Sequence, residues 1–185
     1  MSDLVEKFNK NCSEELKKMG ILFCLLNRIE NNLNHIIETF FCDFNQLKGV
    51  TLNQILLGKN IKLETKRTMF LKIIEHTTRY AEKGNFEFEK NKWLKFCKDL
   101  QKIQEVRNKL AHKFLGFSEN VVFYQEILKN DNNKNYTFDK KEINLDKEIE
   151  KFDKIFDESE LLFTDFLNQV LPIVRDCQKC NLSDI

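Results

Sequence analysis

The sequence predicts an all-α fold, an up-and-down bundle of about four to five helices with a small β-hairpin or ordered loop before the last helix. Two observations support this class. The 185 residues include only 5 Gly and 1 Pro, too few for the turns of a sheet-rich fold. Apolar side chains also recur at helical spacing over long segments. We expect one domain over residues 1–185, with residues 118–144 as the β excursion.

The first helix is predicted from Ser13 to about Cys42. Ser13 is a favourable N-cap, and Glu14 and Glu15 place negative charge at the positive end of the helix dipole. From Leu22 onward the apolar residues repeat every three or four positions. This segment is therefore expected to bury one face.

Three more helical segments are predicted in the middle of the chain. Residues 49–58, bracketed by Gly49 and Gly58, are expected to hold a short helical piece led by Thr51. A long helix is predicted over residues 63–82, ending near Gly84. The next is predicted over residues 87–114, with Gly116 as its stop signal.

The pattern changes before the last helix. Residues 121–124 and 136–138 are strand formers, and residues 131–133 between them favour a turn. The helical period returns over residues 145–177, where Pro172 is expected to disturb the end.

Composition limits the compartment. The longest apolar run, residues 20–26, is far shorter than the roughly 18 to 20 residues of a membrane span. The N-terminus has no signal-peptide pattern, so we expect a cytoplasmic protein without a membrane partner. Of the six Cys, only Cys177 and Cys180 form a C-x-x-C pair, which is half of a structural zinc site. No metal or cofactor is predicted.

The formal charge of +1 conceals a segregation of charge along the chain. Residues 1–58 carry −1, residues 59–113 carry +8 and residues 114–185 carry −6. The middle third is therefore able to present a basic surface to phosphates. The alternative is that its lysines merely solvate a helix face. Trp93, Phe86 and Phe88 beside them are expected in the core rather than stacked on bases.

The most informative stretch is Arg-Asn-Lys-Leu-Ala-His, from Arg107 to His112, at the end of a predicted helix. Arg107 falls in a gap of the apolar stripe, and the sequence predicts a core-facing position for it. Burying such a charge is costly unless it is paired or faces a cleft. Asn108 and His112 lie about 40° apart around the helix, and Arg107 lies about 140° from His112, an offset that a long guanidinium can cover.

These residue types suit metal-free cleavage of RNA. His112 is able to move a proton near neutral pH, Arg107 to hold a phosphate, and Asn108 to orient either one. The 2′-OH of RNA would attack its own phosphate, a route closed to DNA. Because one His cannot act as both acid and base, a symmetric dimer would complete the site.

The motif resembles that of the HEPN superfamily, helical proteins that include metal-independent endoribonucleases of toxin–antitoxin, abortive-infection and antiviral defence systems. The resemblance implies catalytic roles for Arg107, Asn108 and His112, a composite site across a homodimer, and an antitoxin or defence-complex partner. It also implies a polar residue on the first helix facing the motif, either Glu30 or Asn27. Lys109, inside the string, is taken as a supporting residue.

One position departs from the family. Its toxins that are paired with nucleotidyltransferase antitoxins carry a modified Tyr two residues after the His, where this chain has Phe114. Arg28 and His35 also satisfy the loose Arg-to-His spacing and are expected to be structural.

Alternatives remain at each position. Arg107 would be structural if paired with Glu30 or Glu105, and His112 would be an ordinary cation at a helix C-terminus. Asn108 would then be a surface residue. Three functions stay open: a dimeric endoribonuclease, a catalytically inactive HEPN-like module that binds RNA or nucleotides or scaffolds a complex, and a helical protein-interaction domain.

Overall fold

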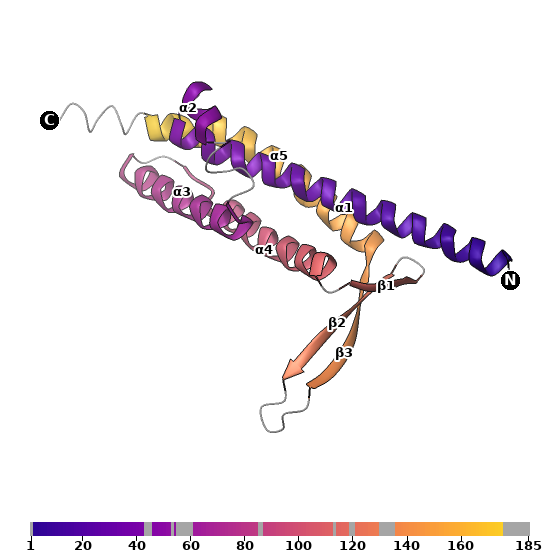
Figure 1. The fold of residues 1–185 in the computed structure, drawn as a ribbon. Coiled ribbons are helices and arrows are strands. Elements are labelled where there is room, and N and C mark those ends of the chain that lie inside the picture. The colour runs from indigo at the N-terminus through magenta and orange to yellow at the C-terminus, as the bar shows by residue number, and fades with distance from the viewer. Residues whose placement is uncertain are drawn as a thin grey trace. The chain divides into compact units, whose positions relative to one another are not determined.

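The predicted fold class is confirmed, because helices dominate and an antiparallel sheet is inserted before the last long helix (Figure 1). The computed structural model describes residues 2–42, 46–52, 54, 61–84, 87–112, 114–118, 121–129 and 136–175. The elements are α1 (Ser2–Cys42), α2 (Gln46–Thr51), α3 (Leu63–Gly84), α4 (Lys90–His112), β1 (Phe114–Ser118), β2 (Val121–Lys129), β3 (Tyr136–Asn144), α5 (Leu145–Asp165) and the π-helical segment η2 (Phe166–Val170).

The start of α1 differs from the prediction. The helix begins at Ser2, so Ser13 lies inside it as an exposed residue and is not its N-cap. Residues 2–12 contain neither Gly nor Pro to stop a helix, and an exposed Ser is tolerated within one. Ser13 is therefore a favourable capping residue at which α1 does not begin.

Gly49 lies within α2 instead of bounding it, and Thr51 ends this helix instead of leading one. A Cβ at Gly49 would lie 2.2 Å from the Glu38 carboxylate, so Gly permits α2 to approach α1 closely. Gly58 falls outside the described residues. The bounds of α3, by contrast, agree with the prediction.

The β excursion begins earlier than expected. The helix predicted over residues 87–114 ends at His112. Gly116, which was expected to be its stop signal, lies within β1. The strands form a three-stranded antiparallel sheet in the order β1-β2-β3, with an irregularity between Phe114 and Gly116. Residues 114–118 have aromatic and apolar side chains that suit a strand as well as a helix, which explains the misplaced boundary.

The chain forms two compact units, each assembled from distant segments. The sheet unit comprises Met1–Leu26 and Lys102–Lys154, and the bundle unit comprises Asn27–Gln101 and Ile155–Ile185. Neither unit can be cut from the chain as one continuous piece. A single domain over residues 1–185 stays a prediction.

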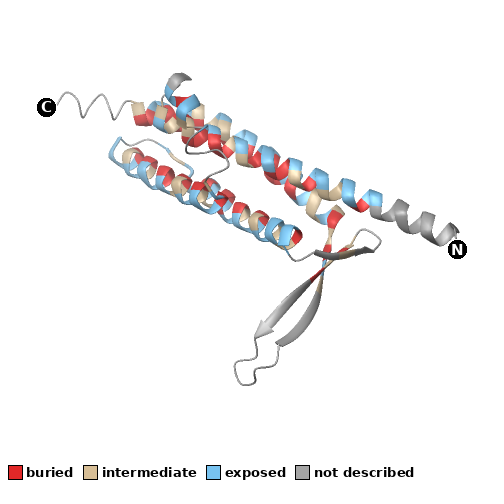
Figure 2. Ribbon diagram, in the orientation of Figure 1, coloured by how far each residue is buried: buried red, intermediate tan, exposed pale blue. Residues whose placement is uncertain are grey.

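An aromatic cluster joins α3, α4 and η2 within the bundle unit. Trp93 is 2% exposed and packs against Phe70 and Phe88, each with ring centroids 5.8 Å away, and against Phe166. Phe70 also meets Phe96 edge to face at 5.8 Å. The core role predicted for Trp93 is thus confirmed, and Figure 2 shows the buried faces of α3 and α4 as continuous stripes.

Polar contacts attach α1 to the other helices of this unit. The Asn32 side chain donates to Ser159 Oγ on α5 over 2.9 Å, and Arg28 lies 3.9 Å from the centre of the Phe156 ring. On its other side α1 meets α3 through an ion pair, described below. The four helices therefore contact one another in a closed cycle, α1 to α5 to α4 to α3 and back to α1.

The sheet unit has its own core. Its buried apolar residues come from α1, α4, the sheet and α5: Leu22, Leu25, Leu26, Ile103, Leu110, Val122, Tyr124, Ile143, Leu145 and Phe152. Asn144 caps α5 by accepting a hydrogen bond from the Lys147 backbone N–H over 3.0 Å. Lys18 on α1 pairs with Asp146 at 2.8 Å.

Pro172 disturbs the last helix as expected. Leu171 donates its backbone N–H to the Phe166 carbonyl, a π-helical bond, in the turn just before the proline. Because Pro172 has no N–H for the carbonyl four residues earlier, one hydrogen bond of the regular ladder is missing at this point, although residues 171–175 are again α-helical. Residues 176–185, including Cys177 and Cys180, lie outside the described residues.

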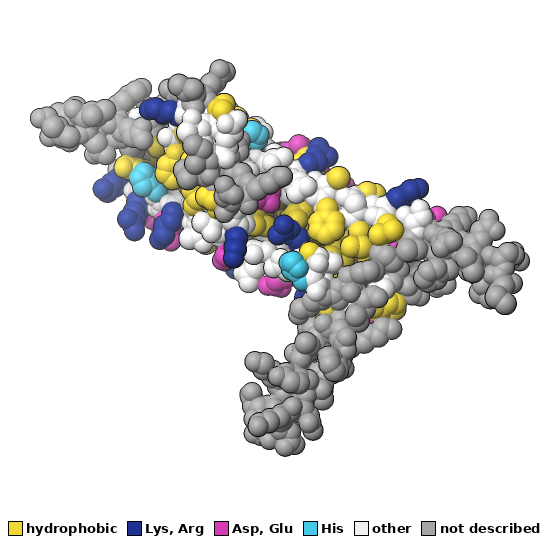
Figure 3. Space-filling model, in the orientation of Figure 1, with side chains coloured by type: hydrophobic (Ala, Val, Ile, Leu, Met, Phe, Trp, Pro, Cys, Tyr) yellow, Lys and Arg dark blue, Asp and Glu magenta, His cyan; other side chains and the backbone are white. Residues whose placement is uncertain are grey.

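Positively charged side chains lie on the surface of the segment predicted to be basic. Figure 3 shows Lys and Arg side chains along the outer side of α3, within the segment that carries +8. None of the described helices is both long enough and apolar enough to cross a bilayer.

Candidate functional site

The last turns of α4 carry the predicted motif within the sheet unit. Ile103 and Leu110 are 0% and 4% exposed and anchor this part of the helix to the core. Lys109 and His112 lie in the final turn, where cations interact favourably with the helix dipole. The motif thus lies on a helix that packing holds from one side.

Arg107 is exposed, so the predicted core-facing position is wrong. Ile103 and Leu110 are seven residues apart, which is close to two helical turns, so both lie on nearly the same face of α4. One turn after Ile103, this face falls between Val106 and Arg107. Val106 is the residue that turns toward the core, because it is half-buried. The guanidinium therefore avoids burial instead of requiring a partner.

Asn108 and His112 are also exposed. They lie one helical turn apart on the same side of α4, whereas Arg107 projects about 140° from His112. Within the described part of the chain, we find no hydrogen bond or ion pair made by the side chains of these three residues. Their polar groups are consequently open to a ligand or to another chain.

Lys109 has a different environment. It is half-buried, and its ammonium lies 5.5 Å from the centre of the Tyr124 ring on β2. Tyr124 is 4% exposed, so the ring presents a fixed face to this cation. Lys109 therefore contacts the sheet from the last turn of α4, and its supporting role in the site stays a prediction.

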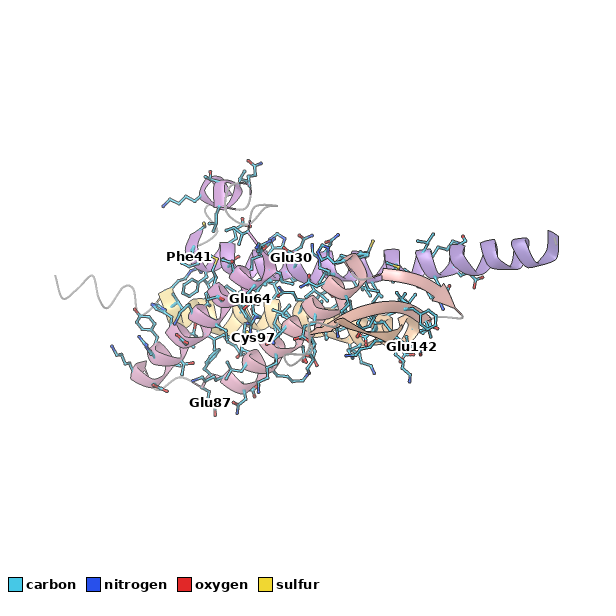
Figure 4. The ribbon with its side chains drawn as sticks, turned by 60° about the horizontal axis from the view of Figure 1, so that its bottom comes forward. Glu30, Phe41, Glu64, Glu87, Cys97 and Glu142 are labelled. Atoms are coloured by element: carbon cyan, nitrogen blue, oxygen red, sulfur yellow. The ribbon has the colours of Figure 1, made fainter. Side chains whose placement is uncertain are left out.

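Glu30 and Asn27 belong to the bundle unit. The Glu30 carboxylate accepts a 2.5 Å hydrogen bond from Lys66 Nζ, and this lysine is only 2% exposed (Figure 4). Asn27 is exposed. Glu30 therefore compensates a buried charge of the bundle, and a role for either residue beside the motif stays a prediction.

The second Arg and His pair makes contacts within the bundle unit, which agrees with the structural role expected for it. Arg28 covers the Phe156 ring, while His35 lies 3.7 Å from the Glu38 carboxylate and contacts the Phe163 ring. Both side chains are thus engaged in contacts of the bundle unit. The Arg and His side chains of the pair on α1 thus make contacts with other residues, whereas those of the pair on α4 make none with the described residues.

Sequence reasoning missed a row of aromatic rings on the bundle unit. Phe41 meets Phe40 at 5.2 Å, Phe40 meets His76 at 5.6 Å, and His76 meets Tyr80 at 4.4 Å, all edge to face. The four-residue spacing of His76 and Tyr80 was the available signal, but the approach of α1 is a tertiary feature.

The described cysteines lie on helices, yet their environments differ. Cys97 is buried, and desolvation raises the pKa of its thiol to about 12, with a smaller opposing effect from Arg67. Cys24 is exposed. Among the described residues, no group of three His, Cys, Asp or Glu side chains is placed to hold a metal ion.

Comparison with family models, curated proteins and solved structures found no match to this chain. The resemblance to the HEPN superfamily therefore rests on the residues of the motif and on the helical pattern around them.

Proposed function

We propose that this protein is a metal-independent endoribonuclease of a prokaryotic defence or toxin–antitoxin system, acting in the cytoplasm. The observation that carries the proposal is the exposure of Arg107, Asn108 and His112 on the last turns of α4, with no partner for them among the described residues. Exposed Arg, Asn and His side chains on the same stretch of helix suit recognition of a phosphodiester and proton transfer to and from the reacting ribose oxygens.

The reaction begins when the ribose 2′-oxygen attacks the adjacent phosphorus. One His112 imidazole takes the 2′-OH proton, and Arg107 stabilises the negative charge that develops on the phosphorane oxygens. A second imidazole, in its protonated form, gives a proton to the departing 5′-oxygen. The products are a 2′,3′-cyclic phosphate end and a free 5′-OH end, so no metal-bound water is required.

Two copies of the chain supply the two imidazoles. Arg107 and His112 leave α4 about 140° apart, so a phosphate between two facing helices can meet Arg107 of one copy and His112 of the other. This arrangement also explains why one chain leaves these side chains exposed. An antitoxin or defence-complex protein would then act by covering α4 or by separating the copies.

The test is cleavage of labelled single-stranded RNA in EDTA. His112→Ala should lower the cleavage rate by about 10²- to 10⁴-fold, because it removes both acid and base. The matched control is His35→Ala, which alters the other Arg-to-His pair and should cleave normally. Circular dichroism checks that both variants fold, and end analysis should find cyclic phosphate.

Three outcomes would contradict the proposal. Undiminished cleavage by His112→Ala would remove this residue from the mechanism. RNA binding by the native protein with steep salt dependence but no product would favour the inactive HEPN-like binding or scaffolding module. A monomer without affinity for RNA would instead favour a protein-interaction domain.

A further inference from the structure

The row of Phe41, Phe40, His76 and Tyr80 runs from the end of α1, where Figure 4 labels Phe41, to α3. Phe41 is 57% exposed, His76 is exposed, and Phe40 and Tyr80 are half-buried. A folded protein normally hides rings that touch one another in a series. Here the series reaches the surface, so it offers π-faces to a ligand.

Cations lie along the same face of α3. Lys72, Arg79 and Lys83 are exposed and project within about 60° of His76 around the helix. They extend over a rise of roughly 16 Å, comparable with a few nucleotides of extended strand. Rings and positive charges therefore alternate on one surface.

The Glu75 carboxylate lies in a positively charged environment. Its pKa is lowered, first by a hydrogen bond from Lys72 and also by the charges of Arg79 and Lys90. Three cations from α3 and the start of α4 thus surround one acid. The Lys72–Glu75 pair is exposed at 2.8 Å, and such pairs are weak enough for a phosphate to replace the carboxylate.

We propose that this aromatic row, with its flanking cations, is a binding surface for single-stranded RNA. Bases stack on the rings of Phe41, His76 and Tyr80, and phosphates lie against Arg79 and Lys83. This inference rests on the proposed function for its choice of RNA, and it assigns the capture of substrate to α3 instead of to the motif on α4. Rings and cations together recognise a single strand, since a duplex hides its base faces.

The state of His76 suits stacking. Partial desolvation beside the neighbouring rings, and then the charge of Arg79, lower the pKa of its imidazole. Near neutral pH the ring is therefore mainly uncharged and behaves as an aromatic face, while the adjacent Arg79 supplies the positive charge.

The test measures binding without cleavage. A fluorescein-labelled single strand of about 12 nucleotides with 2′-O-methyl riboses cannot be cut by 2′-oxygen attack, and fluorescence anisotropy reports its binding. Tyr80→Leu and Phe41→Leu should each weaken binding about 5-fold or more, whereas Tyr80→Phe, which keeps the ring, should bind like the native protein. Arg79→Gln should lower the slope of affinity against salt by about one ion.

Several outcomes would overturn the inference. Native-like binding by both Tyr80→Leu and Phe41→Leu would do so, as would equal affinity for the same sequence as a duplex. Loss of the dimer in Phe41→Leu, with unchanged strand binding, would assign the surface to a second copy instead. A single-stranded DNA of the same sequence tests the preference for ribose: equal binding would contradict the choice of RNA.

The two proposals fail separately. If the native protein binds the uncleavable strand through the rings but cuts no RNA, the proposed nuclease fails and the stacking surface stands. If His112→Ala alone abolishes cleavage while the ring variants bind and cut normally, the nuclease stands and the stacking surface fails.

Discussion

The two ends of α4 follow the same helical period but treat their charged residues differently. In the bundle unit, Lys92 and Lys95 bind Asp165 and Glu158 on α5, beside the buried Trp93. In the sheet unit, Arg107, Asn108 and His112 are exposed, with no partner among the described residues. The first end contributes to packing, whereas the second leaves the Arg107 charge available.

The two ends show that the role of a charged side chain on a helix depends on the groups that face it, and not on its position in the apolar repeat. Lys95 also lies 3.9 Å from Asp99, so its ammonium interacts with two carboxylates, and its pKa is raised first by the hydrogen bond to Glu158. Arg107 has no such neighbour among the described residues. Variants at the two ends should therefore separate stability from activity.

The largest expected effect on stability is in the packed end of α4. Phe96 is 1% exposed and meets Phe70 edge to face, so Phe96→Ala should leave a cavity and lower the free energy of unfolding by about 3–5 kcal/mol. Urea denaturation followed by circular dichroism measures this loss. The control is Lys98→Ala, an exposed neighbour on α4, which should change stability by no more than about 0.5 kcal/mol. A similar small change for Phe96→Ala would show that this end is not a packed core.

The buried ion pair of the bundle should give the next largest effect. Glu30→Gln leaves the Lys66 charge buried without a carboxylate and should lower the free energy of unfolding by about 3 kcal/mol. Lys66→Met should cost less, because the remaining Glu30 carboxylate is 24% exposed and can be hydrated.

The double variant Glu30→Gln with Lys66→Met completes this comparison. It should recover much of the loss caused by Glu30→Gln alone, since it removes the unpaired ammonium. Equal losses for the two single variants, with no recovery in the double variant, would contradict the assigned role of Glu30. A selective loss of RNA cleavage in Glu30→Gln without loss of stability would instead support its predicted place beside the motif.

Helical period and the scarcity of Gly and Pro were enough to predict the fold class and the bounds of α3. Helix boundaries were less predictable where one residue type suits two different structural positions. Ser13 suits an N-cap but is also tolerated inside a helix, and Gly49 permits a close approach to Glu38 instead of ending a helix. Propensity alone does not distinguish these uses.

The candidate site was predictable as a set of residue types but not in its burial. The apolar repeat placed Arg107 in a gap, and only the packed structure shows that Val106 occupies that slot. The aromatic row was not predictable, because Phe40 and His76 come from helices separated in sequence. Contacts between distant segments depend on tertiary packing, which single-sequence patterns do not specify.

The smallest expected effect on stability is at the exposed end of α4. Arg107→Ala should change the free energy of unfolding by no more than about 0.5 kcal/mol, because the side chain is exposed and makes no ion pair with any described residue. The same variant should lose RNA cleavage if the guanidinium stabilises the phosphorane. Urea denaturation and the cleavage assay on one preparation compare the two quantities directly. A loss of stability above about 1.5 kcal/mol would instead assign Arg107 a structural charge, the alternative that its sequence left open, because exposed residues without partners seldom cost so much.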